Sequence, residues 1–98
     1  FTTLLNPNSP RIMPEISRFF GIVIYIFYDE HNPPHFHAEY GKYSISVEIR
    51  SGIVKGRFPK KQLRVVLDWY DLHKKELMED WQLATKDQPL KKIKPFEK

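Results

Sequence analysis

The sequence predicts a single α+β domain in which a mainly antiparallel sheet of about four strands packs on a long C-terminal helix. Two observations predict this class. Residues 16–58 contain apolar runs of strand length separated by breaks rich in proline and glycine, whereas residues 60–84 place apolar side chains at steps of three and four. The 98 residues are enough for one modest core, which the 41% of hydrophobic residues can fill.

The composition excludes several classes of protein and of site. No cysteine is present, so disulfides and thiolate metal sites are excluded. The longest apolar run, residues 22–28, is too short to span a bilayer, and no signal-peptide pattern opens the sequence. We therefore expect a cytoplasmic protein that does not enter a membrane. The formal net charge of +4 permits contact with nucleic acid or an acidic partner.

The first elements follow from local composition. Residues 1–12 are rich in Asn, Pro and Ser, which disfavour helix and strand, so we expect a flexible leader there. The α+β domain is expected to span residues 13–85. Within it, residues 16–28 are apolar in both alternating sets, which predicts one central strand covered on two sides. Gly21 would mark a bulge or a close approach in this strand.

A hairpin is predicted around Gly41 and Lys42, which lie between two alternating runs and therefore fix the register. The expected pairs are Tyr40 with Tyr43, Ala38 with Ile45 and Phe36 with Val47 on one face, and Glu39 with Ser44, His37 with Ser46 and His35 with Glu48 on the other. The first set is apolar and faces the core. The second set is polar, and a slip of one residue would exchange the two faces.

The remaining elements are a strand, a helix and a tail. Ser51 and Gly52 predict a tight turn into a short strand at residues 53–58. Pro59 suits the first turn of a helix, which we expect to run from Lys60 to about Ala84.

The end of the chain carries two further expectations. His73 falls on the apolar stripe of the helix, so we expect a core histidine with a satisfied nitrogen and a break of the helix near it. Residues 86–98 combine two prolines with several lysines, which predicts a basic, poorly ordered tail.

Three of the four histidines lie within residues 31–37, and this stretch is the candidate site. His35 and His37 alternate onto one strand face with Glu39, and Glu48 lies opposite His35. A carboxylate beside an imidazole holds its tautomer, so two histidines on this face can divide the base and acid roles in cleaving RNA at its own 2′-hydroxyl. We predict His35, His37, Glu39 and Glu48 as catalytic residues.

The same face has two other interpretations. His35 and His37 are spaced to share one metal ion, with His31 or a carboxylate as third ligand and a position left for water. That interpretation implies a divalent metal cofactor, whereas the acid–base interpretation needs no cofactor. The simplest interpretation is a polar solvent face in which His35 hydrogen-bonds Glu48 across the ladder.

Basic residues cluster where the last strand meets the helix; they are Lys55, Arg57, Lys60, Lys61 and Arg64. We predict that Lys60, Lys61 and Arg64 bind phosphate, partly at the helix N-terminus. The alternative is a solvated edge whose lysines prevent the addition of another strand.

Three segments resemble one family. They are MPEISRF at residues 13–19, DEHNPPHFHAEYG at residues 29–41, and LDW with the following LH at residues 67–73. The chain is similar over residues 13–95 to the short prokaryotic family labelled domain of unknown function 4160. The resemblance implies a small cytoplasmic protein, often encoded beside a second small protein in an arrangement that looks like a toxin–antitoxin pair. It carries over no catalytic residues, because no activity is established for the family.

These observations lead to one functional hypothesis and two alternatives. The first is a component of a toxin–antitoxin-like module that acts on or binds RNA through the histidine-rich strand face, with a small protein partner encoded nearby. One alternative is a non-catalytic module that binds a protein or a nucleic acid. The other is a metal-dependent hydrolase. Whether the protein is an enzyme stays open at this point.

Overall fold

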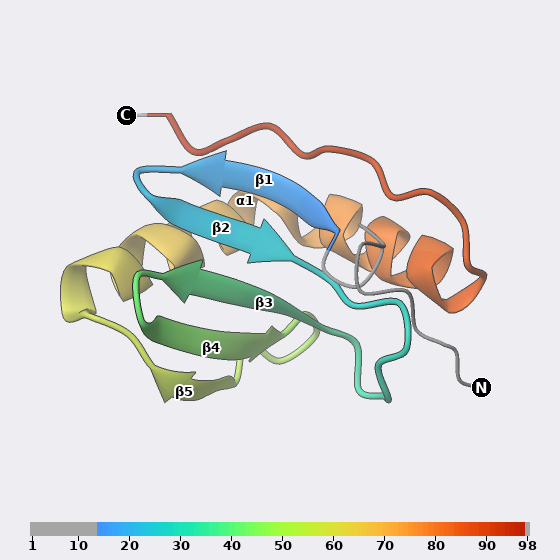
Figure 1. Ribbon diagram of the computed structural model, residues 1–98, viewed down its shortest axis with the longest axis horizontal. Helices are drawn as coiled ribbons and strands as arrows, with labels where there is room; N and C mark the ends of the chain where they lie inside the picture. Colours follow the sequence, from blue (N-terminus) through green and yellow to red (C-terminus); the bar gives the residue numbers. More distant parts are fainter. Residues whose placement is uncertain (1–13, 98) are drawn as a thin grey trace.

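The computed structural model describes residues 14–97 and confirms the α+β class. Five antiparallel strands lie side by side in chain order, and one long helix follows them (Figure 1). The elements are β1 (Glu15–Phe19), β2 (Ile22–Tyr25), β3 (His35–Tyr40), β4 (Tyr43–Glu48), β5 (Val54–Arg57) and α1 (Lys60–Thr85). The predicted leader, residues 1–12, lies outside the described residues. Between residues 14 and 97, no helix has the length and apolar character needed to cross a membrane.

The predicted central strand at residues 16–28 is two strands, which is why the sheet has five strands and not about four. Phe20 and Gly21 form a two-residue turn in which both have positive φ, 52° and 79°. Positive φ at both central positions is the pattern of a type I′ hairpin turn. Phe19 then pairs with Ile22, and β1 becomes an edge strand.

The predicted β3–β4 hairpin register is confirmed at all six pairs, from His35 opposite Glu48 to Tyr40 opposite Tyr43. Gly41, in the two-residue loop, has φ of 58°, which glycine adopts without steric cost. The apolar set of side chains therefore faces the helix, and the polar set, including both histidines, lies on the opposite face of the sheet.

The core lies between the sheet and α1. Phe36 is fully buried, and its ring centroid lies 5.9 Å from those of both Trp69 and Tyr70 on the helix. The Tyr70 hydroxyl donates a hydrogen bond of 2.6 Å to the Ile49 carbonyl, which ties the helix to the end of β4. The helix is interrupted at His73, as expected, where φ is −127°. The Nδ1 atom of His73 is paired with a carboxylate oxygen of Glu76.

Residues 86–97 differ from the expected disordered tail. They run back along β1 as an extended segment (Figure 1). Ile93 is buried and its N–H donates to the Ile16 carbonyl at 2.8 Å, while Trp69 Nε1 donates to the Lys94 carbonyl at 2.9 Å. Apolar side chains inside this lysine-rich segment explain the difference, because they bury surface that composition alone does not reveal.

Asp80 links α1 to the C-terminal segment. Its side chain is fully buried, and Oδ1 accepts a hydrogen bond of 2.8 Å from the Lys91 N–H. The second oxygen, Oδ2, has no hydrogen-bond partner within the described residues. Burial raises the pKa of Asp80 from its ordinary value of 3.8 to about 6. Compared with the unfolded chain, the folded protein therefore holds the proton of this carboxyl to a higher pH.

The first prediction concerns Gly56, in β5, whose φ is 109°. A Cβ there would lie 2.5 Å from the Ser44 carbonyl oxygen, so the backbone of β4 or β5 must move. We expect Gly56→Ala to lower the free energy of unfolding by about 3 kcal/mol, measured by urea denaturation. Gly41→Ala is the control, because its Cβ would meet nothing within 4 Å and only its positive φ carries a cost, about 1 kcal/mol. Equal stability of the two variants would contradict this account.

The second prediction concerns the pH dependence of stability. Because the pKa of Asp80 is raised to about 6 in the folded state, its stabilising contribution is complete below about pH 3.8 and is lost as the pH rises through 6. The unfolding free energy of the wild type, minus that of Asp80→Asn, should therefore decrease between pH 4 and pH 7. Asp71→Asn, at an exposed aspartate of the same helix, should not change the slope. Parallel curves for wild type and Asp80→Asn would refute the assignment.

Candidate functional site

His35 and His37 lie side by side on the face of β3 opposite Phe36, as the hairpin register predicts. Their neighbour in the strand, Phe36, points into the core, so alternation sends both imidazoles to the other face. The two ring centroids are 5.0 Å apart, with an interplanar angle of 73°. The two histidines therefore form a pair whose ring nitrogens can act on one group.

Glu30, in the loop between β2 and β3, completes the cluster. Its Oε1 atom lies 2.5 Å from His35 Nε2 and 3.6 Å from His37 Nε2. Glu30 could not be predicted from periodicity, because the loop that carries it follows no strand or helix period. The one feature of the sequence that bears on the position of Glu30 is the proline pair that follows it, Pro33 and Pro34. Prolines restrict the backbone, so they constrain the path by which the loop returns to β3. The Asn32–Pro33 peptide bond in this loop is cis.

The orientation of His35 is determined by its second nitrogen. Nδ1 is 2.8 Å from the Pro33 carbonyl oxygen, which can only accept, so Nδ1 carries a proton and donates. Nε2 is therefore the atom directed at Glu30. The ring also packs on Trp81 of α1, with centroids 5.2 Å apart, and this contact limits its rotation.

His37 is more deeply enclosed. Its ring stacks on Tyr25 at 5.2 Å with an angle of 12°, and its other neighbour is the edge of Phe27 at 4.9 Å. Nε2 is buried and has no hydrogen-bond partner among residues 14–97. Burial lowers the pKa of His37 below its ordinary value of 6.5, and the nearby charge of Glu30 only partly opposes this effect. The imidazole of His37 is therefore neutral at pH 7 and keeps an available lone pair.

The two predicted supporting carboxylates bind other partners. Glu39 Oε2 accepts a hydrogen bond of 2.8 Å from the Tyr25 hydroxyl, and burial together with this bond raises the pKa of Tyr25. Glu48 Oε1 accepts a hydrogen bond of 2.8 Å from Ser51. Glu48 lies opposite His35 in the ladder, but the nitrogens of His35 are directed at Pro33 and Glu30.

A pocket of about 180 Å³ opens beside the cluster. Its walls include Glu30, His35, Glu48 and Lys55, so two carboxylic side chains, an imidazole and a lysine line the same space. His31, predicted as a metal ligand, is also in this wall but does not belong to the group formed by Glu30, His35 and His37. Among the described residues, Lys55 is the one lysine in this lining, which also contains the carboxylates Glu30 and Glu48.

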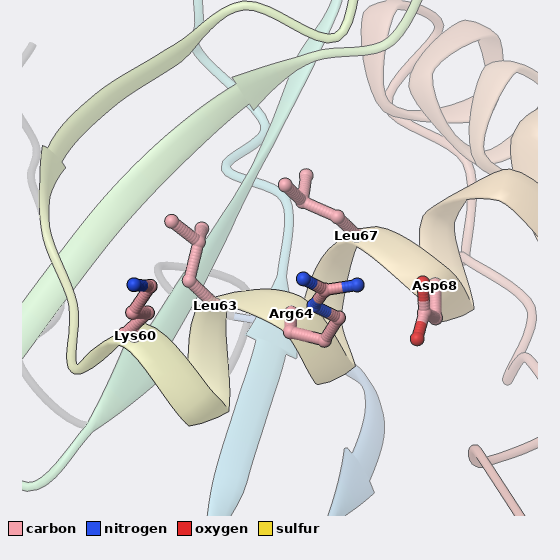
Figure 2. Close-up of a pocket in the computed structure, with 5 residues that line it drawn as sticks. All are labelled: Lys60, Leu63, Arg64, Leu67 and Asp68. Atoms are coloured by element: carbon pink, nitrogen blue, oxygen red, sulfur yellow. The ribbon is translucent and has the colours of Figure 1, made fainter.

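The structure does not bring the predicted phosphate-binding residues to the histidines. Lys60 and Arg64 line a separate groove of about 360 Å³ on the first turns of α1 (Figure 2). Lys61 lies at another surface, beside Phe20. Because α1 covers the opposite face of the sheet and begins at the end away from the start of β3, these cations are remote from the cluster (Figure 1).

The fold and the cluster together define a small α+β domain with a histidine–carboxylate site at the start of β3, where Trp81 of α1 packs on His35. A family model matches residues 21–82, a range that contains the whole cluster of Glu30, His35 and His37. The chain belongs to this family, described as Domain of unknown function (DUF4160). No curated protein and no solved structure shows significant similarity to the chain.

Proposed function

We propose that this protein cleaves RNA at the cluster formed by Glu30, His35 and His37. The observation that carries the proposal is the convergence of two imidazoles and a carboxylate on one face, beside a pocket that contains Lys55. Groups of this kind activate a hydroxyl or a water for attack on phosphorus, and a cation holds the phosphate. The formal net charge of +4 adds long-range attraction for a polyanion, to which Lys60, Lys61 and Arg64 contribute from the start of α1.

The cluster can act in two ways. In acid–base cleavage, one imidazole takes the proton of the 2′-hydroxyl as its oxygen bonds to phosphorus, and the other gives a proton to the departing 5′-oxygen. The products are a 2′,3′-cyclic phosphate and a 5′-hydroxyl. In metal-assisted cleavage, a metal held by the cluster would supply an activated water, and the products would be a linear phosphate and a hydroxyl. The chemical nature of the new RNA ends therefore distinguishes the two routes.

In this proposal the protein is one component of a toxin–antitoxin-like module. In such a module, a small protein partner encoded nearby would block RNA cleavage until it is released. The partner would cover the pocket wall around His35 and Lys55, since access to this wall is what cleavage requires. Glu39 and Glu48 keep a supporting role through the hydrogen bonds that fix Tyr25 and the end of β4.

The third prediction tests the cleavage. Purified, untagged protein should cleave a mixed RNA substrate, and His37→Ala should lower the rate by about 100-fold or more, as removal of a proton-transfer group does. Glu30→Gln should lower it similarly. Glu76→Gln is the matched control, because Glu76 also pairs with a histidine but lies on α1, away from the cluster.

Two results would refute the proposal. One is intact RNA after incubation with the wild type, both with and without added divalent metal ions. The other is cleavage that survives in the His35→Ala/His37→Ala double variant, which would identify a contaminating nuclease. If RNA stays intact but binds, the non-catalytic binding module becomes the function to pursue.

A further inference from the structure

We propose that Glu30, His35 and His37 bind one divalent transition-metal ion, such as Zn²⁺. The ligand atoms would be Glu30 Oε1, His35 Nε2 and His37 Nε2. This inference rests on the proposed function for the role of the ion, since it names the cofactor of the same site. The binding itself stands on the arrangement of the three side chains and can be measured without RNA.

The three atoms already lie at nearly the required separations. All are within 4.8 Å of one another. Ligands about 2.0–2.1 Å from a tetrahedral zinc are about 3.4 Å apart, and the separation of 3.6 Å between Glu30 Oε1 and His37 Nε2 is close to this. The shorter separation of 2.5 Å to His35 Nε2 must widen by about 1 Å on this geometry. Glu30 can provide that movement, because its side chain extends from a loop.

The hydrogen bonds around the cluster also match those found around metal-binding histidines. Metal-binding histidines characteristically donate their other ring N–H to a carbonyl or a carboxylate, which fixes the ring and its tautomer. His35 does so through Nδ1 to the Pro33 carbonyl oxygen at 2.8 Å. Nε2 of His37 is a buried nitrogen without a hydrogen bond in the part of the chain that the structure describes, although such atoms are usually paired. Bound metal would satisfy it.

The donor types select the class of metal. Two imidazoles and one carboxylate suit zinc and its first-row neighbours, whereas Mg²⁺ and Ca²⁺ prefer oxygen ligands. Three protein ligands leave at least one coordination position for water, which is the pattern of catalytic sites. The pocket reaches two of the ligands, Glu30 and His35, so solvent and substrate have access to that position.

The position of Lys55 suggests the substrate chemistry. Its ammonium group lines the same pocket as Glu30 and His35 and would hold a phosphate oxygen of RNA. The bound metal would supply a water activated for attack on phosphorus, and the proton of that water would pass to solvent. The bond from phosphorus to one ribose oxygen breaks, and that oxygen takes a proton from water. No oxidant or reductant is needed.

The fourth prediction is stoichiometric metal binding. Metal-free, untagged full-length protein is titrated with Zn²⁺ by calorimetry and with Co²⁺ by visible absorption. One ion per chain should bind, and Co²⁺ should develop d–d bands without a thiolate charge-transfer band, because cysteine is absent. Glu30→Gln, His35→Gln and His37→Gln should each weaken binding by more than the 10–100-fold that removal of an outer-shell partner costs.

His31→Gln is the matched control, because His31 lies in the same loop and pocket wall but outside the cluster. It should bind metal like the wild type. Circular dichroism of each variant shows whether it is folded. If the substitutions in β3 unfold the protein, Glu30→Gln still tests the site, because Glu30 lies in a loop and outside the sheet. Absence of binding by the wild type, or binding that survives Glu30→Gln and His37→Gln, would overturn the inference.

RNA cleavage is measured on the same samples, so the two proposals can fail separately. Metal binding without cleavage would sustain the metal site and refute the proposed function. Cleavage that yields cyclic phosphate ends, is unaffected by chelator, and occurs in protein that binds no metal would sustain the function and overturn the metal site.

Discussion

The register of the β3–β4 hairpin is the constraint on which the rest of the structure depends. Because side chains alternate across a strand, one pairing sends Phe36 and Ala38 into the core and His35 and His37 to the opposite face. Burial of the apolar set against α1 drives this choice. A slip of one residue would place two imidazoles against the helix and Phe36 in solvent. The core and the candidate site are therefore specified by the same hydrogen bonds.

Elements whose apolar residues recur with a regular period could be predicted from the sequence. An element whose bounds depend on the backbone conformation of one residue could not. Gly41 predicts the β3–β4 loop, and apolar residues spaced three and four positions apart predict α1. The β1–β2 turn has no such signal, because Phe20 is an apolar residue within an apolar run and its positive φ is rare outside glycine. The C-terminal segment was missed for a related reason, since Ile93 is one buried side chain among lysines.

Only the two residues of the candidate site that lie on β3 could be predicted from the sequence. Alternation brings His35 and His37 together, but Glu30 reaches them through an irregular loop whose path depends on contacts that no period describes. Register places Glu48 opposite His35, yet the carboxylate pairs with Ser51. Backbone pairing limits which side chains are neighbours, and the choice among those neighbours is made by local hydrogen bonds in three dimensions.

The path of residues 86–97 along β1 bears on the order in which the domain can fold during synthesis. Chains emerge from the ribosome N-terminal end first, so β1 is available before any other element of the domain. The segment that covers its free edge, through the bond from Ile93 to Ile16, is the last to appear. The edge of β1 is thus exposed to other strands throughout translation of the domain, and its protection begins only once residue 93 has left the ribosome.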